Sequence, residues 1–246
     1  MTLYQFLRTY IITPPLSASA FTGFWFFGVV AWPFDRDGSL THRVARVWSW
    51  WLLNTAGIRI RIEGTDRLDP HGTYIYVSNH LSLADTPFTT TYLPTIFRFL
   101  AKESLMKVPI IGGHLRRGRH ISVPREDARG AARALAKAAD LLRAKTASVL
   151  IFAEGTRGEG AMQAFKAGAA HLAIQTGVPV VPVAIAGTDE VLPKGAPLLR
   201  PGSISMVVGE PIPSVGLTAA DRGRFTTQLQ ENVSRLLERA EALRRA

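Results

Sequence analysis

The sequence predicts an α/β fold in which helices flank a mostly parallel central sheet, and three observations lead to this. From Gly57 onward, short runs of β-branched and apolar residues alternate with helical patterns. Apolar residues make up 47% of the 246-residue chain and charged residues 20%, enough for a sizeable core and unlike a disordered protein. No internal repeat or linker interrupts residues 57–246, so we expect one α/β domain there, preceded by a separate helical segment over residues 1–56.

Seven strands and four helices are expected in the body of the chain. The strands are Ile58–Glu63, Thr73–Ser78, Ile96–Ala101, His120–Val123, Ser148–Phe152, Val180–Ile185 and Ser203–Val208. The helices are Leu83–Tyr92, Asp127–Ala144, Lys166–Gln175 and the long, charged Thr218–Leu243. In sheets of this kind ligands gather at the carboxyl ends of the strands, so the residues just after each strand are where a site is expected.

The first 56 residues are expected to associate with a membrane. Residues Thr9–Phe34 carry no charge, and all five tryptophans lie within the first 51 residues, where indole rings would suit a membrane–water boundary. Pro14 and Pro15 leave Leu16–Trp32 as the apolar stretch, about 25 Å of helix against a hydrocarbon core of roughly 30 Å. Both a full span and a one-leaflet insertion stay open.

A second, amphipathic helix is expected directly afterwards, because apolar residues recur there at helical spacing while two arginines lie off the stripe. The stripe consists of Val44, Val47, Trp48, Trp51 and Leu52, and the arginines are Arg43 and Arg46. The segment Ala18-Ser19-Ala20 resembles a signal-peptide cleavage site, but the apolar stretch before it is too short. A helix packed on the soluble domain is the remaining alternative, although aromatic crowding over residues 21–27 favours lipid contact.

The charge distribution predicts an anionic partner. The chain has a formal net charge of +10, and residues 98–145 hold 12 Lys and Arg against 4 Asp and Glu. Nucleic acid is the competing explanation, but it leaves the uncharged, Trp-rich terminus unexplained, so no nucleic-acid partner is expected. The absence of cysteine from the sequence excludes disulfides, thiolate metal sites and a cysteine nucleophile.

Two residues after the expected strand Thr73–Ser78 are candidates for acid–base chemistry. His80 and Asp85 are five residues apart, which in an uninterrupted helix would place them about 140° apart. They meet only if His80 lies in the loop and Asp85 in the first helical turn, where the carboxylate would fix the imidazole tautomer and leave the second nitrogen as a base. The alternative is that Ser82 caps the helix with Asp85 as its acidic partner, and both can hold at once.

The loop after the strand Ser148–Phe152 is a candidate anion site. It reads Glu154-Gly155-Thr156-Arg157-Gly158, in which glycines allow close backbone approach and the planar guanidinium suits a phosphate. A glycine-rich turn with a solvated arginine is the simpler alternative. Signatures of serine hydrolases, nucleotide phosphate loops, zinc helices and dinucleotide folds are absent from the sequence, so neither a metal nor a cofactor is expected.

Four segments in this order resemble the conserved blocks of the glycerolipid acyltransferase family, in particular its bacterial 1-acylglycerol-3-phosphate acyltransferase branch. They are Asn79-His80-Leu81-Ser82-Leu83-Ala84-Asp85, Lys102-Glu103-Ser104-Leu105, Phe152-Ala153-Glu154-Gly155-Thr156-Arg157 and Val181-Pro182-Val183. The resemblance covers residues 57–213, and the ordered combination is far more specific than any one block. It implies acyl transfer from a thioester to a lysophospholipid on a membrane-anchored α/β domain.

The resemblance also implies roles for individual residues. His80 would be the general base and Asp85 its orienting partner. The phosphate of the acceptor would be held by Glu154, Gly155, Thr156 and Arg157. Lys102 and Arg125 correspond to basic residues of the second block, and Pro182 to the fourth. The tetrahedral oxyanion of acyl transfer needs N–H donors or a cation, and Gly155 and the loop after His80 are the candidates.

The function expected from the resemblance is transfer of a fatty acyl group from acyl-CoA or acyl carrier protein to 1-acylglycerol-3-phosphate, giving phosphatidic acid. The expected place is the cytoplasmic face of the cell inner membrane, with membrane lipids as partners and no cofactor. A different acceptor, such as a lyso-ornithine lipid, and a non-catalytic adaptor that binds anionic lipids are the alternatives. The presence of both His80 and Asp85 favours an enzyme, because an adaptor needs no oriented base.

Overall fold

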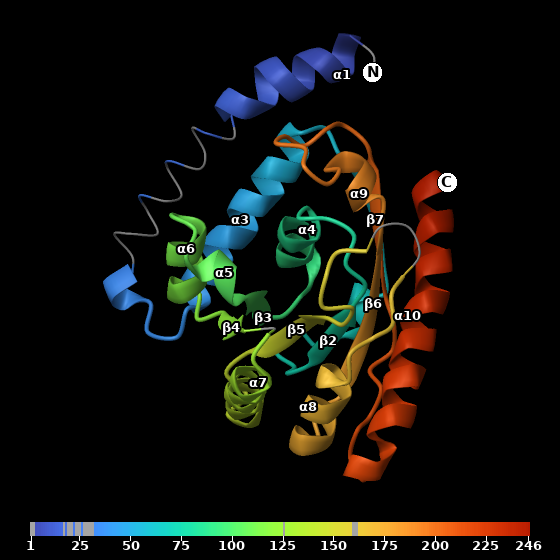
Figure 1. Ribbon diagram of the computed structural model, residues 1–246. Helices are drawn as coiled ribbons and strands as arrows, with labels where there is room; N and C mark the ends of the chain where they lie inside the picture. Colours follow the sequence, from blue (N-terminus) through green and yellow to red (C-terminus); the bar gives the residue numbers. More distant parts are fainter. Residues whose placement is uncertain are drawn as a thin grey trace.

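A computed structural model of the chain describes residues 3–16, 18, 22, 26, 32–124, 126–158 and 162–246. Its centre is a seven-stranded sheet in the order β1-β7-β6-β2-β5-β3-β4 (Figure 1). The strands are β1 (Arg59–Glu63), β2 (Ile75–Ser78), β3 (Phe97–Lys102), β4 (Ile121–Val123), β5 (Ser148–Phe152), β6 (Val180–Ala186) and β7 (Ser203–Val208). Five strands are mutually parallel, and β7 runs antiparallel to β6 with β1 parallel to β7. The predicted mostly parallel sheet is confirmed.

The two central strands β2 and β6 are buried along their whole length because helices cover both faces of the sheet. Every residue of β2 and β6 is buried, as expected for parallel strands with two covered faces. The expected strand at Thr73 begins two residues later, at Ile75, because the Tyr74 N–H donates to the Ser148 hydroxyl (3.0 Å) and not to a neighbouring strand's carbonyl. The other strand boundaries agree with the expectation to within one residue.

Helices form a layer on each face. On one face α7, α8 and α10 pack against the sheet through a core that includes Leu142, Leu172 and Val233. The other face carries α3 and α4, with Leu53 and Phe88 in a second core. The bounds are α3 (Ser39–Thr55), α4 (Asp85–Tyr92), α7 (Ala128–Arg143), α8 (Gly168–Thr176) and α10 (Arg222–Arg245). Short helices complete the fold: α5 (Glu103–Met106), α6 (Ile111–Arg117), α9 (Thr188–Val191), η2 (Trp32–Phe34), η3 (Thr65–Arg67) and η4 (Ala219–Asp221).

The N-terminal helix lies against the end of α3. It comprises α1 (Leu3–Leu7) and the π-helical η1 (Arg8–Ile12), and the Arg8 guanidinium donates to the carbonyls of Asn54 and Thr55. Most of the stretch 16–32 lies outside the described residues, so the choice between a span and a one-leaflet insertion stays a prediction. Within the part of the chain that is described, no helix combines the length and the apolar character needed to cross a bilayer.

Helix α3 is amphipathic, but most of its buried side chains are polar. Its buried side chains are Thr41, His42, Ser49 and Leu53. The outward side carries Val47, Trp50 and Trp51, while Leu52 of the expected stripe packs against the second core. Arg46, expected off the stripe, turns inward and donates to carbonyls at the end of α4, including those of Thr90 and Leu93. Those carbonyls lack helical partners, and this need draws the cation inside.

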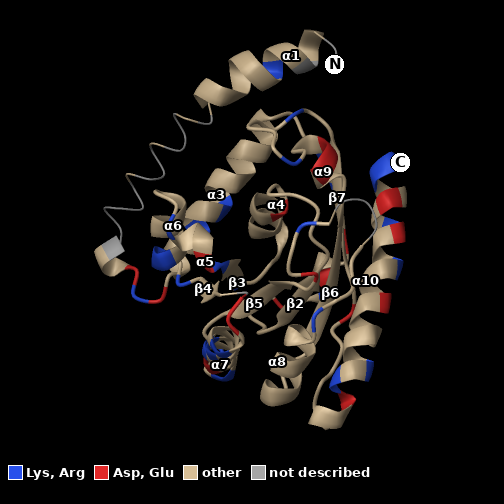
Figure 2. Ribbon diagram, in the orientation of Figure 1, with Lys and Arg blue, Asp and Glu red and all other residues tan. Residues whose placement is uncertain are grey.

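The basic stretch 98–145 does not form a single face. Arg98 is buried and donates to the carbonyls of Phe97 and Asp37, so it ties β3 to the residues before α3. The charged residues of α7 lie on the opposite layer of the sheet from α5 and α6 (Figure 2). The expectation that the whole stretch forms one basic face is therefore wrong, because the chain crosses the sheet between residues 117 and 128.

Acid is expected to destabilise the fold through buried histidines. His42 lies on the buried side of α3 and packs against Phe97 of β3. Burial, reinforced by the charges of Arg46 and Arg98, lowers the pKa of His42 to about 3. Burial also lowers the pKa of His120, whose Nδ1 accepts the Phe99 N–H. Below about pH 6.5 these histidines are protonated in the unfolded chain but stay neutral in the folded chain. The free energy of unfolding should therefore fall by about 1.4 kcal/mol per pH unit for each such histidine.

Denaturant unfolding between neutral pH and pH 5 measures this slope. The His42→Gln variant should show a shallower loss of stability with acid than the wild-type chain. Equal slopes for the two proteins would contradict the assignment to His42.

Candidate active site

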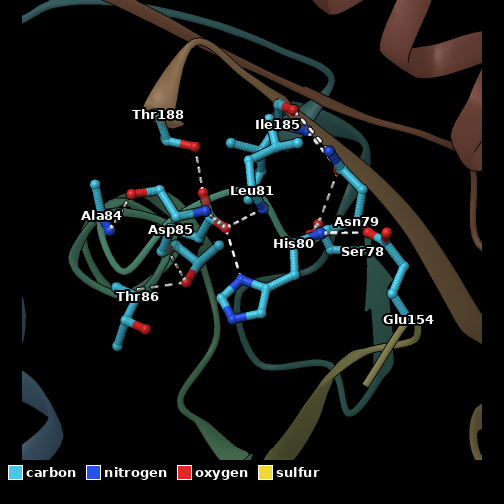
Figure 3. A network of polar contacts seen from close by, with 12 residues as sticks. Ser78, Asn79, His80, Leu81, Ala84, Asp85, Thr86, Glu154, Ile185 and Thr188 are labelled. Atoms are coloured by element: carbon cyan, nitrogen blue, oxygen red, sulfur yellow. Dashed lines mark hydrogen bonds and ion pairs between the residues drawn. The ribbon is translucent and has the colours of Figure 1, made fainter. Parts of the chain in front are cut away.

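The carboxyl ends of four neighbouring strands share one edge of the sheet. Strands β6, β2, β5 and β3 are adjacent and parallel, and they end at Ala186, Ser78, Phe152 and Lys102. The segments that follow the first three of these strands meet at His80 and Asp85 (Figure 3). This edge is where the order of strands in the chain predicted a site.

His80 and Asp85 are in contact. His80 lies in the loop after β2, and Asp85 is the first residue of α4. The His80 Nδ1 atom lies 2.7 Å from the Asp85 Oδ2 atom. Because a carboxylate accepts here, Nδ1 carries the proton and Nε2 of a neutral ring is an acceptor. The local geometry is the loop-and-first-turn arrangement that the spacing required.

The Asp85 carboxylate is fully buried and accepts four hydrogen bonds. Besides His80, its Oδ2 atom accepts the backbone N–H groups of Leu81 (2.8 Å) and Ser82 (2.9 Å). Its Oδ1 atom accepts the Thr188 hydroxyl at 2.5 Å. The Ser82 hydroxyl accepts the Ala84 N–H and not that of Asp85, and the residue before α4 makes no side-chain capping bond, so only the Asp85 half of the expected capping box forms. Because its two oxygens accept four hydrogen bonds, the carboxylate has little freedom to rotate away from the imidazole.

Asn79 links β2 to β6 beyond the end of the regular ladder. Its side-chain amide donates to the Ile185 carbonyl and accepts the Ile185 N–H, each at 2.9 Å. A side chain therefore replaces the backbone pairing at the point where the main chain leaves the sheet. This substitution frees the backbone of His80 to turn toward α4 while the two strands stay together.

The imidazole ring of His80 is held flat against Phe152. Their ring centroids lie 4.0 Å apart with an interplanar angle of 11°. The side chain of His80 keeps 12% of its surface exposed, and its Nε2 atom makes no hydrogen bond with the described residues. Figure 3 shows this second nitrogen turned away from the polar network. The ring is thus oriented by protein on one side and open to a substrate on the other.

Glu154 positions the backbone around His80. Its Oε1 atom accepts the His80 N–H (2.7 Å), and its Oε2 atom accepts the Gln163 N–H (2.8 Å). The Gly158 N–H donates to the His80 carbonyl, so the loop after β5 contacts His80 on both sides of its peptide. Because both carboxylate oxygens are engaged and the residue is buried, Glu154 is placed to shape the loop and not to touch an anion.

Gly155 adopts a conformation that other residues avoid. Its φ is +75°, and a Cβ added there would lie 2.7 Å from the Lys166 Nζ atom. Its N–H donates to the Phe152 carbonyl, which closes the turn after β5. The glycine therefore allows the turn and the close approach of the Lys166 ammonium group, while its N–H is already engaged.

Three predicted anion-binding side chains differ in their availability. Arg157 is half-buried, and its guanidinium forms no hydrogen bond or ion pair with any residue in the described ranges. Thr156 is exposed and its hydroxyl lies 3.3 Å from the Gln163 amide oxygen. Lys102 is exposed at the end of β3, one strand further along the same edge. Arg125 lies outside the described residues.

Pro182 does not join the other predicted residues. It lies in the middle of β6, opposite Val77 of β2, and points toward the layer that contains α10. There it lines a hollow of about 260 Å³ together with Arg235 and Leu236. Its carbonyl accepts the Gly209 N–H across the antiparallel pair. The expectation that Pro182 binds substrate is corrected, because alternation along the strand directs it to the face away from His80.

Thr188 and Asn79 are the polar contributors that sequence reasoning did not assign. Thr188 directly follows β6 and Gly187, so its place after a strand next to β2 was a usable signal. Nothing in the residues near His80 indicates which hydroxyl reaches Asp85, since the two are 103 positions apart. Among the described residues, no group of three or more potential ligands is placed to hold a metal ion.

Comparisons with known proteins show the family of this chain. The sequence model of the family described as Acyltransferase matches residues 59–186, which include the whole edge up to the end of β6. A 1-acyl-sn-glycerol-3-phosphate acyltransferase of Pseudomonas aeruginosa is 33% identical over 215 residues, 85% of this chain and 82% of that protein. The chain belongs to the acyltransferase family. Thr188 lies two residues beyond the segment that the family model matches.

Two further relatives extend the comparison of this acyltransferase. A chloroplast 1-acyl-sn-glycerol-3-phosphate acyltransferase of Arabidopsis thaliana is 34% identical over 174 residues, 70% of this chain and 48% of that protein. The chain spans about half the length of this protein and of the relatives from Chlamydomonas reinhardtii and Brassica napus. The crystal structure of the 1-acyl-sn-glycerophosphate acyltransferase PlsC from Thermotoga maritima superposes with a TM-score of 0.71 at 25% identity, covering 94% of this chain and 98% of that one.

Removal of the Glu154 carboxylate should destabilise the acyltransferase. In a Glu154→Ala variant the partly buried His80 N–H loses its acceptor, and an unsatisfied donor away from water costs about 1–3 kcal/mol of unfolding free energy. Thr156→Ala, in the same loop but exposed, should change it by less than about 0.5 kcal/mol. Urea unfolding of the two variants beside the wild-type chain gives the difference, and equal midpoints for all three would show that the Glu154 contacts contribute nothing.

Proposed function

We propose that this acyltransferase transfers a fatty acyl group from an acyl thioester, either acyl-CoA or acyl carrier protein, to the free hydroxyl of 1-acylglycerol-3-phosphate, giving phosphatidic acid. The observation that carries the proposal is the His80 imidazole, oriented by Asp85 at Nδ1 and unengaged at Nε2. No described hydroxyl is bonded to Nε2, and the sequence has no thiol, so the base is available to the acceptor itself. The names of the relatives support this acceptor.

The proposed step balances with the two substrates and the chain's own side chains, and it uses no cofactor. His80 Nε2 removes the proton from the acceptor hydroxyl as that oxygen attacks the thioester carbonyl carbon. The resulting imidazolium is stabilised by the Asp85 carboxylate 2.7 Å from Nδ1. When the tetrahedral intermediate collapses, the C–S bond breaks and the leaving thiolate takes the proton from His80. An ester and a free thiol are formed, and the base is regenerated.

The oxyanion of the intermediate needs donors other than those expected from the sequence. The Gly155 N–H is engaged by Phe152, and the Leu81 and Ser82 N–H groups are engaged by Asp85. The backbone N–H groups of Thr156 and Arg157 make no hydrogen bond with the described residues. Since the Gly158 N–H contacts the His80 carbonyl, this segment lies beside the base, and we assign the oxyanion to it.

The acceptor phosphate is assigned to the cations at the same edge. Arg157 has a guanidinium without a protein partner in the described chain, and a planar fork suits two phosphate oxygens. Lys102 stands at the end of β3 as a second positive charge. Glu154 and Gly155 support this assignment indirectly, because they set the turn from which Arg157 projects.

We propose that the enzyme acts at a membrane, at the cytoplasmic face of the cell inner membrane. A two-chain product cannot leave into water at low cost, since each buried methylene contributes about 0.8 kcal/mol. Exposed apolar side chains of α1 and of α3, such as Leu3, Phe6, Trp50 and Trp51, support contact with lipid. Anionic headgroups and the anionic donors would be attracted by the net positive charge.

Incubation of the purified chain with a panel of lysolipids tests the proposal. The panel contains 1-acylglycerol-3-phosphate and a lyso-ornithine lipid, each offered with acyl-CoA and with acyl carrier protein thioesters. Mass spectrometry of the products identifies both substrates. Formation of phosphatidic acid supports the proposal, and acylation of the lyso-ornithine lipid alone would refute the assigned acceptor while retaining the chemistry.

His80→Ala should abolish acyl transfer while the fold persists. Loss of a general base costs about 10²–10⁴-fold in rate, and the ring contributes one face of the Phe152 stack but no core packing. His171→Ala, on the exposed side of α8, is the matched control and should transfer acyl groups at the wild-type rate. Steady-state rates report acyl transfer by both variants, and circular dichroism reports whether they are folded. Turnover by the His80 variant at the wild-type rate would contradict the role of His80 as the base.

Arg157→Lys should raise the Michaelis constant for the acceptor by about tenfold and leave that for the donor little changed. The charge is kept, but the bidentate fork is lost, and a hydrogen bond to a charged group is worth about 1.5–3 kcal/mol. Arg129→Lys on the opposite layer is the control. A selective rise in the donor constant would instead assign Arg157 to the donor subsite.

A further inference from the structure

The exposed apolar side chains of the α/β body gather at the edge that contains His80. Among the described residues after α3, the large exposed hydrophobics are Leu83, Val108, Ile110, Ile111 and Val215. Leu83 follows His80 by three positions, and the next three lie where the chain passes from α5 into α6, with Ile111 as the first residue of α6. A side chain added at Gly177, just before β6, would meet Val215 at 3.7 Å, so Val215 belongs to the opposite edge of the sheet.

The turn formed by residues 107–111, here called the aliphatic turn, is held in a fixed conformation. The Ile110 backbone has φ 68° and ψ −60°, a left-handed conformation that is strained for a β-branched residue. The Gly112 N–H donates to the Val108 carbonyl, and the Arg116 guanidinium donates to the Met106 carbonyl. A Cβ at Gly112 would lie 2.1 Å from the Met106 oxygen, so only glycine lets α5 and α6 approach this closely.

This fixed backbone directs aliphatic groups into solvent. Ile110 is 51% exposed and Ile111 is 48% exposed, although neither the strain nor the exposure improves the stability of an isolated protein in water. A protruding pair of isoleucines on a rigid turn gains free energy only when another apolar phase covers it. The conformation is therefore suited to contact with something outside the chain.

The charged residues near the aliphatic turn in the sequence indicate which apolar phase covers it. Residues 102–119 contain five Lys and Arg and one acidic residue, Glu103. Lys102, Lys107 and Arg116 are exposed. Aliphatic groups ringed by cations match the boundary of an anionic bilayer, where acyl chains lie beneath negative headgroups.

The aliphatic turn lies in the same layer as the outward face of α3. A Cβ at Gly38, just before α3, would lie 3.0 Å from the Gly118 backbone, so the end of α6 abuts the start of α3. Figure 1 shows α5 and α6 beside α3, on the side of the sheet that also carries α4. The exposed Trp50 and Trp51 of α3 therefore lie in the same layer as Ile110.

We propose that the aliphatic turn inserts Val108, Ile110 and Ile111 into the headgroup–acyl boundary of an anionic membrane and so brings the His80 edge to the lipid. The inference rests on the proposed function only for the choice of lipid as partner, and it adds a contact made by the catalytic domain itself. Lipid could then reach His80 without leaving the interface, because the turn follows β3 at the edge where the site lies.

Site-specific fluorescence can test the insertion, because the sequence contains no cysteine. Ile110→Cys and Ile111→Cys are each labelled with an environment-sensitive nitrobenzoxadiazole probe in the full chain. Val215→Cys is the matched control, since Val215 is 82% exposed at the opposite edge. The proteins are mixed with phosphatidylcholine vesicles, with and without phosphatidylglycerol. Intrinsic tryptophan emission reports binding independently, because all five tryptophans precede residue 52.

With the anionic vesicles, the probes at positions 110 and 111 should shift to the blue and brighten several-fold. Lipids spin-labelled near the headgroup end of the chain should quench them, while the probe at position 215 stays unchanged. Tryptophan changes without any probe response at positions 110 and 111 would overturn the proposal, as would a response that needs no lipid and grows with protein concentration. Insertion without acyl transfer would refute the proposed function alone, and transfer without insertion would refute this inference alone.

Discussion

The arrangement of the site depends on the need of one buried carboxylate for donors. A carboxylate without hydrogen bonds in an apolar interior costs several kcal/mol, so Asp85 folds into place only with all its partners present. Two of its four donors are backbone N–H groups of the loop after β2, one is the imidazole of His80, and one is the hydroxyl of Thr188 after β6. The carboxylate thus fixes α4, the histidine loop and the end of β6 in one geometry, and the orientation of the base follows from it.

A second buried carboxylate completes the support of the base from the other side. Glu154 accepts the N–H of His80. The Gly158 N–H donates to the His80 carbonyl, and Phe152 stacks on the His80 ring. His80 is therefore held at its peptide and at its side chain by β5 as well as by α4. Groups fixed in this way need no reorganisation when charge develops on the imidazole, which is the physical content of preorganisation. The single open atom, Nε2, is where the chemistry is assigned.

The two helical layers differ in what they cover and what they expose. On the α7, α8 and α10 side, helices bury apolar stripes against the sheet in the usual way. On the other side, α3 buries His42, Ser49 and the Arg46 side chain and exposes Trp50 and Trp51. This reversal is stable because Arg46 finds carbonyl acceptors at the end of α4. It leaves apolar side chains exposed on the same layer as α4, whose first residue is Asp85, and the exposed turn between α5 and α6 lies on that layer too.

The strands of the sheet and the contact between His80 and Asp85 were predictable from the sequence, because both depend on short-range information. Runs of β-branched residues mark strands locally, and His80 reaches Asp85 across only five positions. The tertiary structure alone decided the long-range partners: Thr188 joins Asp85 across 103 positions, and Asn79 joins Ile185 across 106. It also decided that Pro182 faces away from the site and that Arg98 is buried. Composition and spacing cannot supply these facts, because which face a strand residue takes and which distant group satisfies a buried charge are fixed only when the strands are ordered and packed.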